Sequence, residues 1–428
     1  MRADTEPSSW RLLGWWAGSV AAALVHNGLW ATPNLAFVSL IASNPGTNPF
    51  GGALAGDYML TDVSLTSLAW LVGQSAPHEI ARLHLVVLVL GWAAVVYLAY
   101  RRFGYRAARA LTVLIAASPA VTVSMQFLGQ PDPLTAMCGI AMVLARRWWA
   151  VVALGVIAGL THPEQAVFMA AAAGTLRTFL PPHLPPNPRS PNPRSVVRDE
   201  PVELAAHHRT DGSLRRAGVG VAAAVGGVLI GRVLTQIWFW VNDIVISTPR
   251  TRYLELGLSS FVEHHTQQPV ALLWSLWGPL WLVLAALLGA VVLQRSGRAL
   301  TVVDNVPSGV RTAGLVASTV ALLALVPVVV TLDETRVYAV ITAPLLAAGA
   351  LWIAAVLRER VAVWGAGGLL VLTALLPGVM ATGITTWRSQ FDTPAMATFV
   401  LGGTVPDRLE LTPWLLEPFD FVIPDPPS

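Results

Sequence analysis

The sequence predicts an all-α polytopic membrane protein, and three observations lead to that prediction. Hydrophobic residues make up 54% of the chain and charged residues only 12%, whereas a soluble domain has roughly 25% charged residues. Several apolar runs are long enough to cross a bilayer, which takes about 20 helical residues. Arginines are concentrated on every second connection between these runs, which is typical of cytoplasmic loops. We therefore expect about 11 transmembrane helices, within a range of roughly 9 to 13.

Eleven apolar segments are the candidates for these helices. Two of them, Leu134–Ala145 and Trp148–Thr161, are short for a full crossing at about 1.5 Å per residue. They form either shortened helices or a re-entrant hairpin, and because they come as a pair, the later loops keep their sides. The full set, approximate at its boundaries, is Leu12–Ala31, Leu83–Tyr100, Ala110–Met125, Leu134–Ala145, Trp148–Thr161, Gln165–Phe179, Gly218–Val241, Val270–Leu293, Ala313–Thr331, Val337–Leu357 and Val361–Thr382.

The arginines predict the orientation of the chain. If the N-terminus is cytoplasmic, 20 of the 27 arginines fall at inner positions, six fall outside and Arg232 lies within an apolar segment. This is a strong positive-inside bias. We therefore place the N-terminus in the cytoplasm and the C-terminus outside. The six outer arginines are Arg82, Arg250, Arg252, Arg336, Arg388 and Arg408.

The chain divides into a transmembrane domain, residues 1–383, and a short outer tail, residues 384–428. We interpret Trp10–Ala31 as a retained first helix, because no clear small-residue cleavage site follows a short apolar core.

Residues 177–217 form the longest cytoplasmic loop, which contains a tandem NPRSP/NPRS repeat. Proline disfavours helix, so we predict a disordered linker there. The single cysteine, Cys138, excludes an intramolecular disulfide and a cysteine metal cluster.

Carboxylates are concentrated in the outer loops, and two of them stand in the first of these. The loop Gly51–Thr66 is rich in glycine and holds Asp57 and Asp62, which we take as candidate catalytic acids. An alternative for Asp57 is a solvated turn residue. An alternative for Asp62, or for Thr61, is the cap of a short amphipathic helix within the loop.

Candidates for substrate binding lie at the ends of later helices. Asp132 stands in Gln-Pro-Asp-Pro, where it is also well placed to cap the helix that follows. His162 and Glu164 stand in Thr-His-Pro-Glu, where the helix dipole favours a carboxylate in the first turn. Asp333 and Arg336 are three residues apart, and the alternative to a shared ligand is a simple pair along one helix. Polar groups at this depth are costly and usually face a cavity or a partner.

Arginines and one tyrosine complete the set of binding candidates. Arg250 and Arg252 alternate just before Tyr253, so an extended segment would place both guanidinium groups on one face. The alternative is anchoring beside lipid headgroups. Arg232 lies within an apolar helix, where it would either bind a phosphate or extend towards the membrane surface.

This arrangement resembles the C-type integral-membrane glycosyltransferases, the GT-C superfamily. The matching residues are Asp57 and Asp62 in the first outer loop and Asp132 at the head of the fourth apolar segment. The resemblance runs from about Leu12 to Thr382, as topology more than as sequence, and its motifs are short. Many members carry a large soluble C-terminal domain, whereas only about 45 residues follow here, which leaves acceptor recognition open.

The resemblance implies a polyprenyl-phosphate-linked sugar as the donor and a glycan, a glycolipid or a protein as the acceptor. A carboxylate can serve as the base in inverting sugar transfer, and Asp57 is our candidate. Asp62 and Asp132 would orient donor hydroxyls or a divalent cation. Mg²⁺ or Mn²⁺ would suit oxygen ligands, although many lipid-phosphate donors need no metal. The candidate arginines for the donor phosphate are Arg232, Arg250, Arg252 and Arg336.

The competing class is a transporter or flippase of a lipid-linked saccharide or polymer. Transport sites usually lie near the bilayer midplane, often at broken helices. Most acids here stand at the outer boundary instead, with only His26 and Arg232 deeper. We therefore expect a multi-pass enzyme of a bacterial cytoplasmic membrane, with its active site facing outside, the lipid bilayer around it and no nucleic-acid partner.

Overall fold

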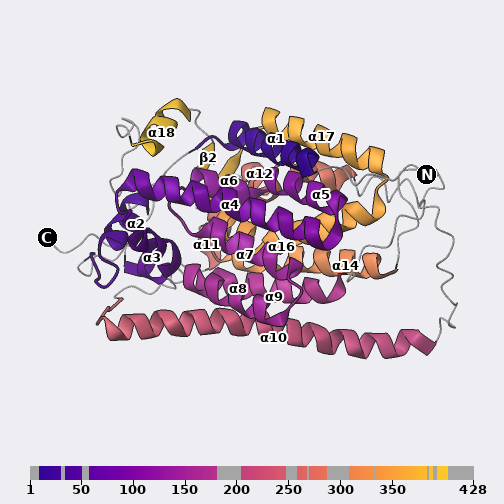
Figure 1. The fold of residues 1–428 in the computed structure, drawn as a ribbon, viewed down its shortest axis with the longest axis horizontal. Coiled ribbons are helices and arrows are strands. Elements are labelled where there is room, and N and C mark those ends of the chain that lie inside the picture. The colour runs from indigo at the N-terminus through magenta and orange to yellow at the C-terminus, as the bar shows by residue number, and fades with distance from the viewer. Residues whose placement is uncertain are drawn as a thin grey trace.

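The computed structural model is a bundle of helices that run mostly along its long axis (Figure 1). It describes residues 9–29, 34–50, 57–180, 204–246, 258–267, 269–286, 308–331, 333–382, 385–388 and 393–402. The main helices run back and forth along the bundle (Figure 1). They are α1 (Ser9–Asn27), α4 (Pro77–Phe103), α5 (Tyr105–Ala116), α6 (Pro119–Gln126), α7 (Asp132–Leu144), α8 (Trp148–Thr161), α9 (Pro163–Phe179), α10 (Leu204–Val241), α12 (Pro269–Trp277), α14 (Ser308–Leu323), α15 (Leu325–Val329), α16 (Glu334–Val356) and α17 (Glu359–Leu375).

The helices are those of a membrane protein. Within the described ranges, three are long and apolar enough to cross a bilayer: α4, residues Arg215–Val241 of α10, and α16. Two bent helix pairs raise this number to five if each pair is one span. The short segments expected as α7 and α8 are single helices of 13 and 14 residues. The α7 helix is buried along almost its whole length, so protein covers it on all sides.

Three of the predicted segments are interrupted. The segment Ala110–Met125 is two helices, α5 and α6, bent by 50° where Ser118 and Pro119 follow one another. The segment Val270–Leu293 begins as α12, bends by 83° at Gly278 and continues as a helix over Leu280–Ala286. The third, Ala313–Thr331, breaks at Ala324 between α14 and α15. Proline lacks an N–H and clashes with the preceding turn, which explains the breaks that precede Pro119 and Pro279.

The C-terminal region differs from the predicted all-α fold, because the end of the predicted segment Val361–Thr382 is a strand. Helix α17 ends at Leu375, before Pro377, and the next residues form the antiparallel hairpin of β1 (Val379–Thr382) and β2 (Thr385–Arg388). Helix α18 (Thr393–Val400) packs against α4, with the Phe399 ring edge-on to His78 at 6.4 Å between centroids. The predicted outer tail is therefore folded in part, and residues 403–428 lie outside the described ranges.

Helix α10 begins at Leu204, inside the segment predicted as a disordered linker. Residues 204–217 contain no proline and are rich in alanine, leucine and arginine, which favour helix. Glycines bring α10 very close to α8: a Cβ added at Gly159 would lie 2.3 Å from the Val228 carbonyl oxygen, and one added at Gly231 would lie 2.4 Å from that of Val156. Such small-residue packing is typical of helices within membranes.

The loop after α1 folds into short helices, none of them long enough to span a bilayer, and one follows Asp62 where a short loop helix was considered. They are α2 (Asn34–Ser43), the 3₁₀ turn Asp57–Thr61 and α3 (Val63–Leu71). The loop also touches the far end of α10, where the Trp238 indole donates to the Pro45 carbonyl at 3.1 Å. This first loop therefore lies over one end of the bundle, at the left of Figure 1.

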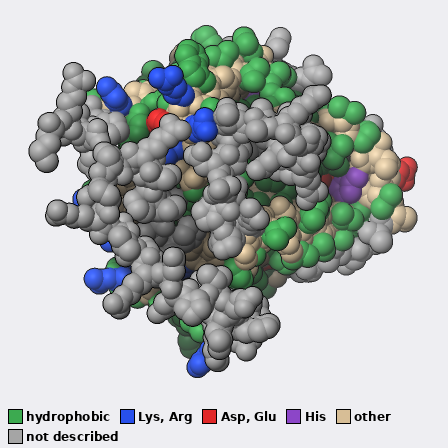
Figure 2. All heavy atoms as spheres, turned by 90° about the vertical axis from the view of Figure 1, so that its right-hand side faces the viewer, with side chains coloured by type: hydrophobic (Ala, Val, Ile, Leu, Met, Phe, Trp, Pro, Cys, Tyr) green, Lys and Arg blue, Asp and Glu red, His purple; other side chains and the backbone are tan. Residues whose placement is uncertain are grey.

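The opposite end carries many of the arginines, and we call it the arginine end: Arg102, Arg106, Arg109, Arg146, Arg147, Arg177, Arg358 and Arg360. Figure 2 looks onto this end, and the charged side chains visible around the undescribed residues are mainly arginines. The Arg102 guanidinium donates to the carbonyls of Val143, Leu144 and Ala145 at 3.2, 2.7 and 3.1 Å. Arg102 therefore satisfies carbonyl groups that a helix C-terminus leaves without partners, whereas Arg106 and Arg109 pair with the Glu359 carboxylate.

Candidate functional site

Carboxylates gather at the other end of the bundle, which we call the acidic end: Asp62, Asp132, Glu164, Asp333 and Glu334. Asp132 is the first residue of α7, and its side chain is 2% exposed. Both of its carboxylate oxygens accept from Arg336 Nε, each at 2.9 Å. The carboxylate therefore forms a buried ion pair with α16, and the alternative of a simple helix cap for Asp132 is wrong.

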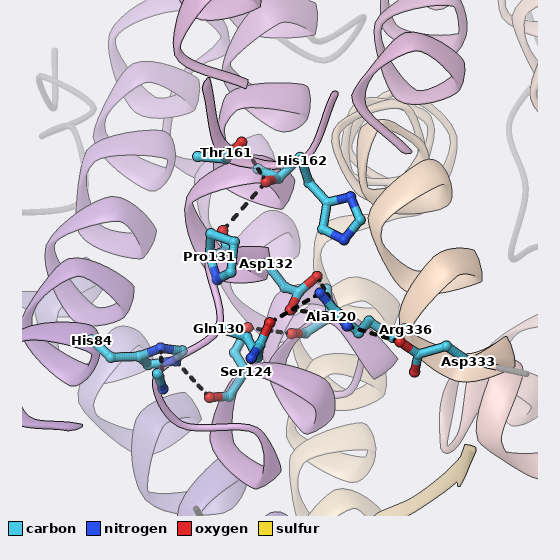
Figure 3. Close-up of polar contacts among 12 residues, drawn as sticks. His84, Ala120, Ser124, Gln130, Pro131, Asp132, Thr161, His162, Asp333 and Arg336 are labelled. Carbon is cyan, nitrogen blue, oxygen red and sulfur yellow. Dashed lines mark hydrogen bonds and ion pairs between the residues drawn. The ribbon is translucent and has the colours of Figure 1, made fainter. Parts of the chain in front are cut away.

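Arg336 is the centre of this cluster (Figure 3). Its Nη1 donates to Asp333 Oδ2 at 2.8 Å, which confirms the pair along one helix, and its Nη2 donates to Gln130 Oε1 at 3.1 Å. Asp62 also interacts with the guanidinium electrostatically. One arginine thus joins the starts of two helices, α7 and α16, and the first loop.

A histidine that the sequence analysis missed positions the loop before Asp132. The Gly129 N–H donates to His84 Nδ1 at 3.0 Å, and His84 Nε2 lies 2.7 Å from the Ser124 carbonyl oxygen (Figure 3). Because Nδ1 accepts, the proton is on Nε2 and the imidazole is neutral. Gly129 has φ +97°, and a Cβ there would lie 2.7 Å from Leu35 of α2. The loop is therefore held by α4 on one side and packed against the first loop on the other.

His162 lies between α8 and α9 with its imidazole directed toward Asp132 (Figure 3). The residue is 4% exposed, and its Nδ1 lies 3.8 Å from Glu164 Oε2. The neighbouring Thr161 hydroxyl accepts from Thr135 at 2.8 Å, which fixes the end of α8 to the start of α7. His162 therefore belongs to the buried cluster, while Glu164, whose side chain is 47% exposed, lies at its edge.

The two acids of the first loop are placed differently. Asp62 is 5% exposed and stands at the N-cap position of α3, as the alternative expected, but its side chain makes no capping hydrogen bond. Asp57 begins the 3₁₀ turn, but its side chain lies outside the described part. Its role as catalytic base remains a prediction, and Asp62 is the first-loop acid whose burial and position at the cluster are described.

The remaining basic candidates are not joined to the cluster in the described part of the chain. Arg232 is half-buried on α10, and its Nη1 is buried without a hydrogen-bond partner among the described residues. Gln236, four residues later on α10, is exposed. Arg250, Arg252 and Tyr253 lie outside the described ranges, so their proposed contact with a phosphate remains a prediction.

Glu334 adds a second buried carboxylate at the start of α16. It is 1% exposed, and its Oε1 lies 3.1 Å from His265 Nδ1 on α11 (Leu258–Gln267). The other nitrogen of His265, Nε2, lies 3.1 Å from the Val329 carbonyl oxygen. The neighbouring Glu334 carboxylate raises the pKa of His265 above its ordinary value, against the opposing effect of burial. This ion pair joins α11 to the acidic end.

The described carboxylates do not form a metal site. Within the described ranges, no three His, Cys, Asp or Glu side chains are placed to hold a metal ion. The carboxylates of Asp132 and Asp333 instead share the Arg336 guanidinium. The residues in place therefore do not fit the Mg²⁺ or Mn²⁺ that the sequence analysis considered.

Comparison with known proteins adds no family to this description. No protein-family model matches the chain, and neither a curated protein nor a solved structure matches it. The acidic end itself therefore carries the functional argument. There the buried Arg336 bonds Asp132, which is 204 residues away in the sequence, and Asp333, which is three residues away.

Proposed function

We propose that the protein is a membrane glycosyltransferase that moves a sugar from a polyprenyl-phosphate-linked donor to an acceptor hydroxyl. The observation that carries this proposal is the buried Asp132–Arg336–Asp333 cluster at one end of an apolar bundle, next to the first loop. Burying charges is costly, and intramembrane ionisable groups usually face a substrate path or a partner. The distribution of arginines along the sequence favours an outer position for this end.

The proposed roles follow from chemistry and depth. A lipid tail would lie along the apolar sides of the bundle, where Leu229, Val233 and Ile237 of α10 are exposed. The sugar would lie under the first loop, beside the buried cluster. A carboxylate of that loop, Asp57 with Asp62 beside it, would take the proton of the acceptor hydroxyl. The acceptor class, a glycan, a glycolipid or a protein, stays open.

A transporter is the second candidate, because two helix pairs are bent by 50° and 83° and broken helices are common at transport sites. The groups at the first bend favour an enzyme instead. The Ser118 hydroxyl donates to the Ile115 carbonyl at 2.8 Å, so it satisfies a carbonyl of the adjacent turn. Neither bend, at residues 116–119 or at residues 277–280, contains a charged residue.

Activity in detergent separates the two candidates. We expect the purified protein, supplied with polyprenyl-phosphate hexoses and pentoses and with glycolipid acceptors, to transfer sugar without a sealed membrane. Chromatography of the lipid products would detect the transfer. Movement of the same lipids across sealed vesicles, with no transfer in detergent, would contradict the proposal and favour a transporter.

Reporter fusions test the orientation separately. A reporter placed after Arg109 or within residues 181–203 is expected to be cytoplasmic, and one placed after Pro427 is expected to be external. An external reporter within residues 181–203 would place the acidic end in the cytoplasm and would contradict an outer active site.

A further inference from the structure

Two buried polar atoms beside Arg336 have no partner in the described part of the chain. Gln130 is 1% exposed, and its Oε1 accepts from Arg336, but its Nε2 amide has no hydrogen-bond acceptor among the described residues. Asp333 is arranged in the same way: Oδ2 accepts from Arg336, while the buried Oδ1 has no partner. Buried polar groups are nearly always hydrogen-bonded, so these two atoms need an explanation.

The two atoms flank the same group. Arg336 Nη1 holds Asp333 and Nη2 holds Gln130, and the two Nη atoms belong to one planar guanidinium. The free donor is the Gln130 amide, and the free acceptor is the Asp333 carboxylate oxygen. These two groups therefore lie on either side of the guanidinium tip. Arg336 fixes the amide orientation, because its N–H can donate only to the amide oxygen.

The chemistry of this face suits hydroxyl groups better than a phosphate. A hydroxyl both donates and accepts, so neighbouring hydroxyls of a sugar can accept from the amide and donate to the carboxylate. A phosphate offers only acceptors, and it would meet the negative charge of Asp333 directly. Asp62, Asp132 and Asp333 together outweigh the one positive charge of Arg336, so the field at this face opposes an anion.

We propose that Gln130 and Asp333 bind the sugar hydroxyls of the donor and set its sugar specificity, with Arg336 as a positioning residue rather than a phosphate ligand. This rests on the proposed function. It also changes the expectation for Arg336, which the sequence analysis grouped with the arginines for the donor phosphate. The phosphate is then left to Arg232, Arg250 or Arg252.

Isosteric substitutions separate this role from a structural one. Gln130→Glu keeps an oxygen for Arg336 and removes the amide donor, and Asp333→Asn keeps an oxygen for Arg336 and replaces the free acceptor with a donor. Two matched controls make the same changes away from the cluster. They are Gln74→Glu in the connection before α4 and Asp243→Asn after α10, where Asp243 is exposed and has φ +53°, a conformation that asparagine also tolerates.

The measurement is binding of two probes to the full-length protein in detergent: a sugar-free polyprenyl phosphate and a panel of polyprenyl-phosphate hexoses and pentoses. We expect both site variants to bind the preferred sugar-bearing probe about tenfold or more weakly than wild type does. A site built to bind a hydroxyl discriminates strongly when that hydrogen bond is lost. Binding of the sugar-free phosphate should change less than about twofold, and both controls should bind as wild type does. Equal weakening of both probes, or of neither, would overturn the inference.

Wild-type protein gives a second test that does not depend on the folding of a variant. Among monodeoxy analogues of the preferred sugar probe, at least one should bind about tenfold more weakly than the parent. Equal binding of all the analogues would overturn the inference while leaving the proposed function standing. Failure of wild-type protein to bind either the sugar-free or any sugar-bearing probe would instead overturn the proposed function.

Discussion

The two ends of the bundle use their charged residues in opposite ways. At the arginine end, guanidinium groups meet backbone carbonyls: Arg102 donates to three of them, and Arg177 donates to the Arg146 carbonyl at 2.7 Å. At the acidic end, two carboxylates, Asp132 and Asp333, share a single guanidinium. Arg106 and Arg109 also share one partner, the half-exposed Glu359 carboxylate. The ends therefore differ in burial, because the Arg336 and Asp132 side chains are only 7% and 2% exposed.

This difference indicates where function lies. An arginine that caps carbonyls at a helix C-terminus is explained by folding alone. The acidic cluster is not, because it buries the Asp132–Arg336 ion pair almost completely and leaves the polar atoms of Gln130 and Asp333 unpaired in the described part. Proteins retain such costly arrangements mainly where a ligand uses them. The predictions below test this contrast, from the largest expected effect to the smallest.

Removing Arg336 should have the largest effect on stability. In Arg336→Ala, the buried Asp132 carboxylate and the partly buried Asp333 carboxylate lose their shared counter-charge, and breaking a buried pair costs about 3–5 kcal/mol. Thermal unfolding in detergent would measure the loss. Arg101→Ala is the matched control, since Arg101 is exposed and donates, among the described residues, to the Tyr97 hydroxyl alone, at 3.2 Å. Equal stability of the two variants would show that the cluster is not held by Arg336.

Neutralising the first-loop acids should abolish activity and leave the fold intact. We expect Asp57→Asn to lower sugar transfer by about 10²–10⁴-fold, the usual cost of losing a general base. Asp62→Asn removes one of the like charges near Arg336, so we expect lower activity with unchanged or higher unfolding temperature. Transfer assays and thermal unfolding of the same samples would show both effects. An Asp57 variant with near-normal turnover would shift the role of base to Asp62.

At the arginine end the expected pattern is reversed. Arg102→Met leaves three helix-terminal carbonyls without their donor, which costs about 1–3 kcal/mol of stability when such groups stay buried. Transfer activity per folded molecule should not change, because the substitution is at the opposite end from the acidic cluster. A fall in specific activity of fully folded protein would contradict the claim that the arginine end serves stability and the acidic end serves activity.

The smallest expected effect is a pH dependence at His265. Its pKa is raised by Glu334, so the folded state favours the charged imidazole. The stabilisation is therefore full below the ordinary pKa of about 6.5 and is lost as the pH rises through the raised pKa. We expect a loss of about 1 kcal/mol or less between pH 6 and 8.5, seen as a falling unfolding temperature. His265→Gln should flatten that slope, and an unchanged slope would assign it to other groups.

The sequence alone predicts a good part of this fold, since apolar length and helix-end residues have local signatures. Helix α8 begins and ends at the predicted residues, Trp148 and Thr161, because Arg147 and His162–Pro163 mark its limits. The bends are less visible, since an apolar run continues through them. Pro119 and Pro279 could have indicated the two bends, but each stood inside a longer predicted segment.

The candidate site is only partly predictable, for a physical reason. Asp132 and Arg336 were both identified from their positions at helix ends, but 204 residues separate them, and no local pattern reports a pairing made by tertiary packing. Gln130 and His84 were missed because a neutral amide or imidazole in an apolar stretch has no distinctive signature. The glycine between two glutamines in the loop before Asp132 was the available hint.

Hydrogen exchange with and without a bound donor lipid tests the central contrast most directly. Simple attraction would take an anionic lipid phosphate to the arginine end, whereas the proposed site lies at the acidic end. With a polyprenyl-phosphate hexose or pentose bound in detergent, we expect slower amide exchange in residues 57–71, 127–135 and 331–337. Residues 100–109 and 143–149 should exchange as they do without the lipid. Protection confined to those arginine-end residues would contradict the account.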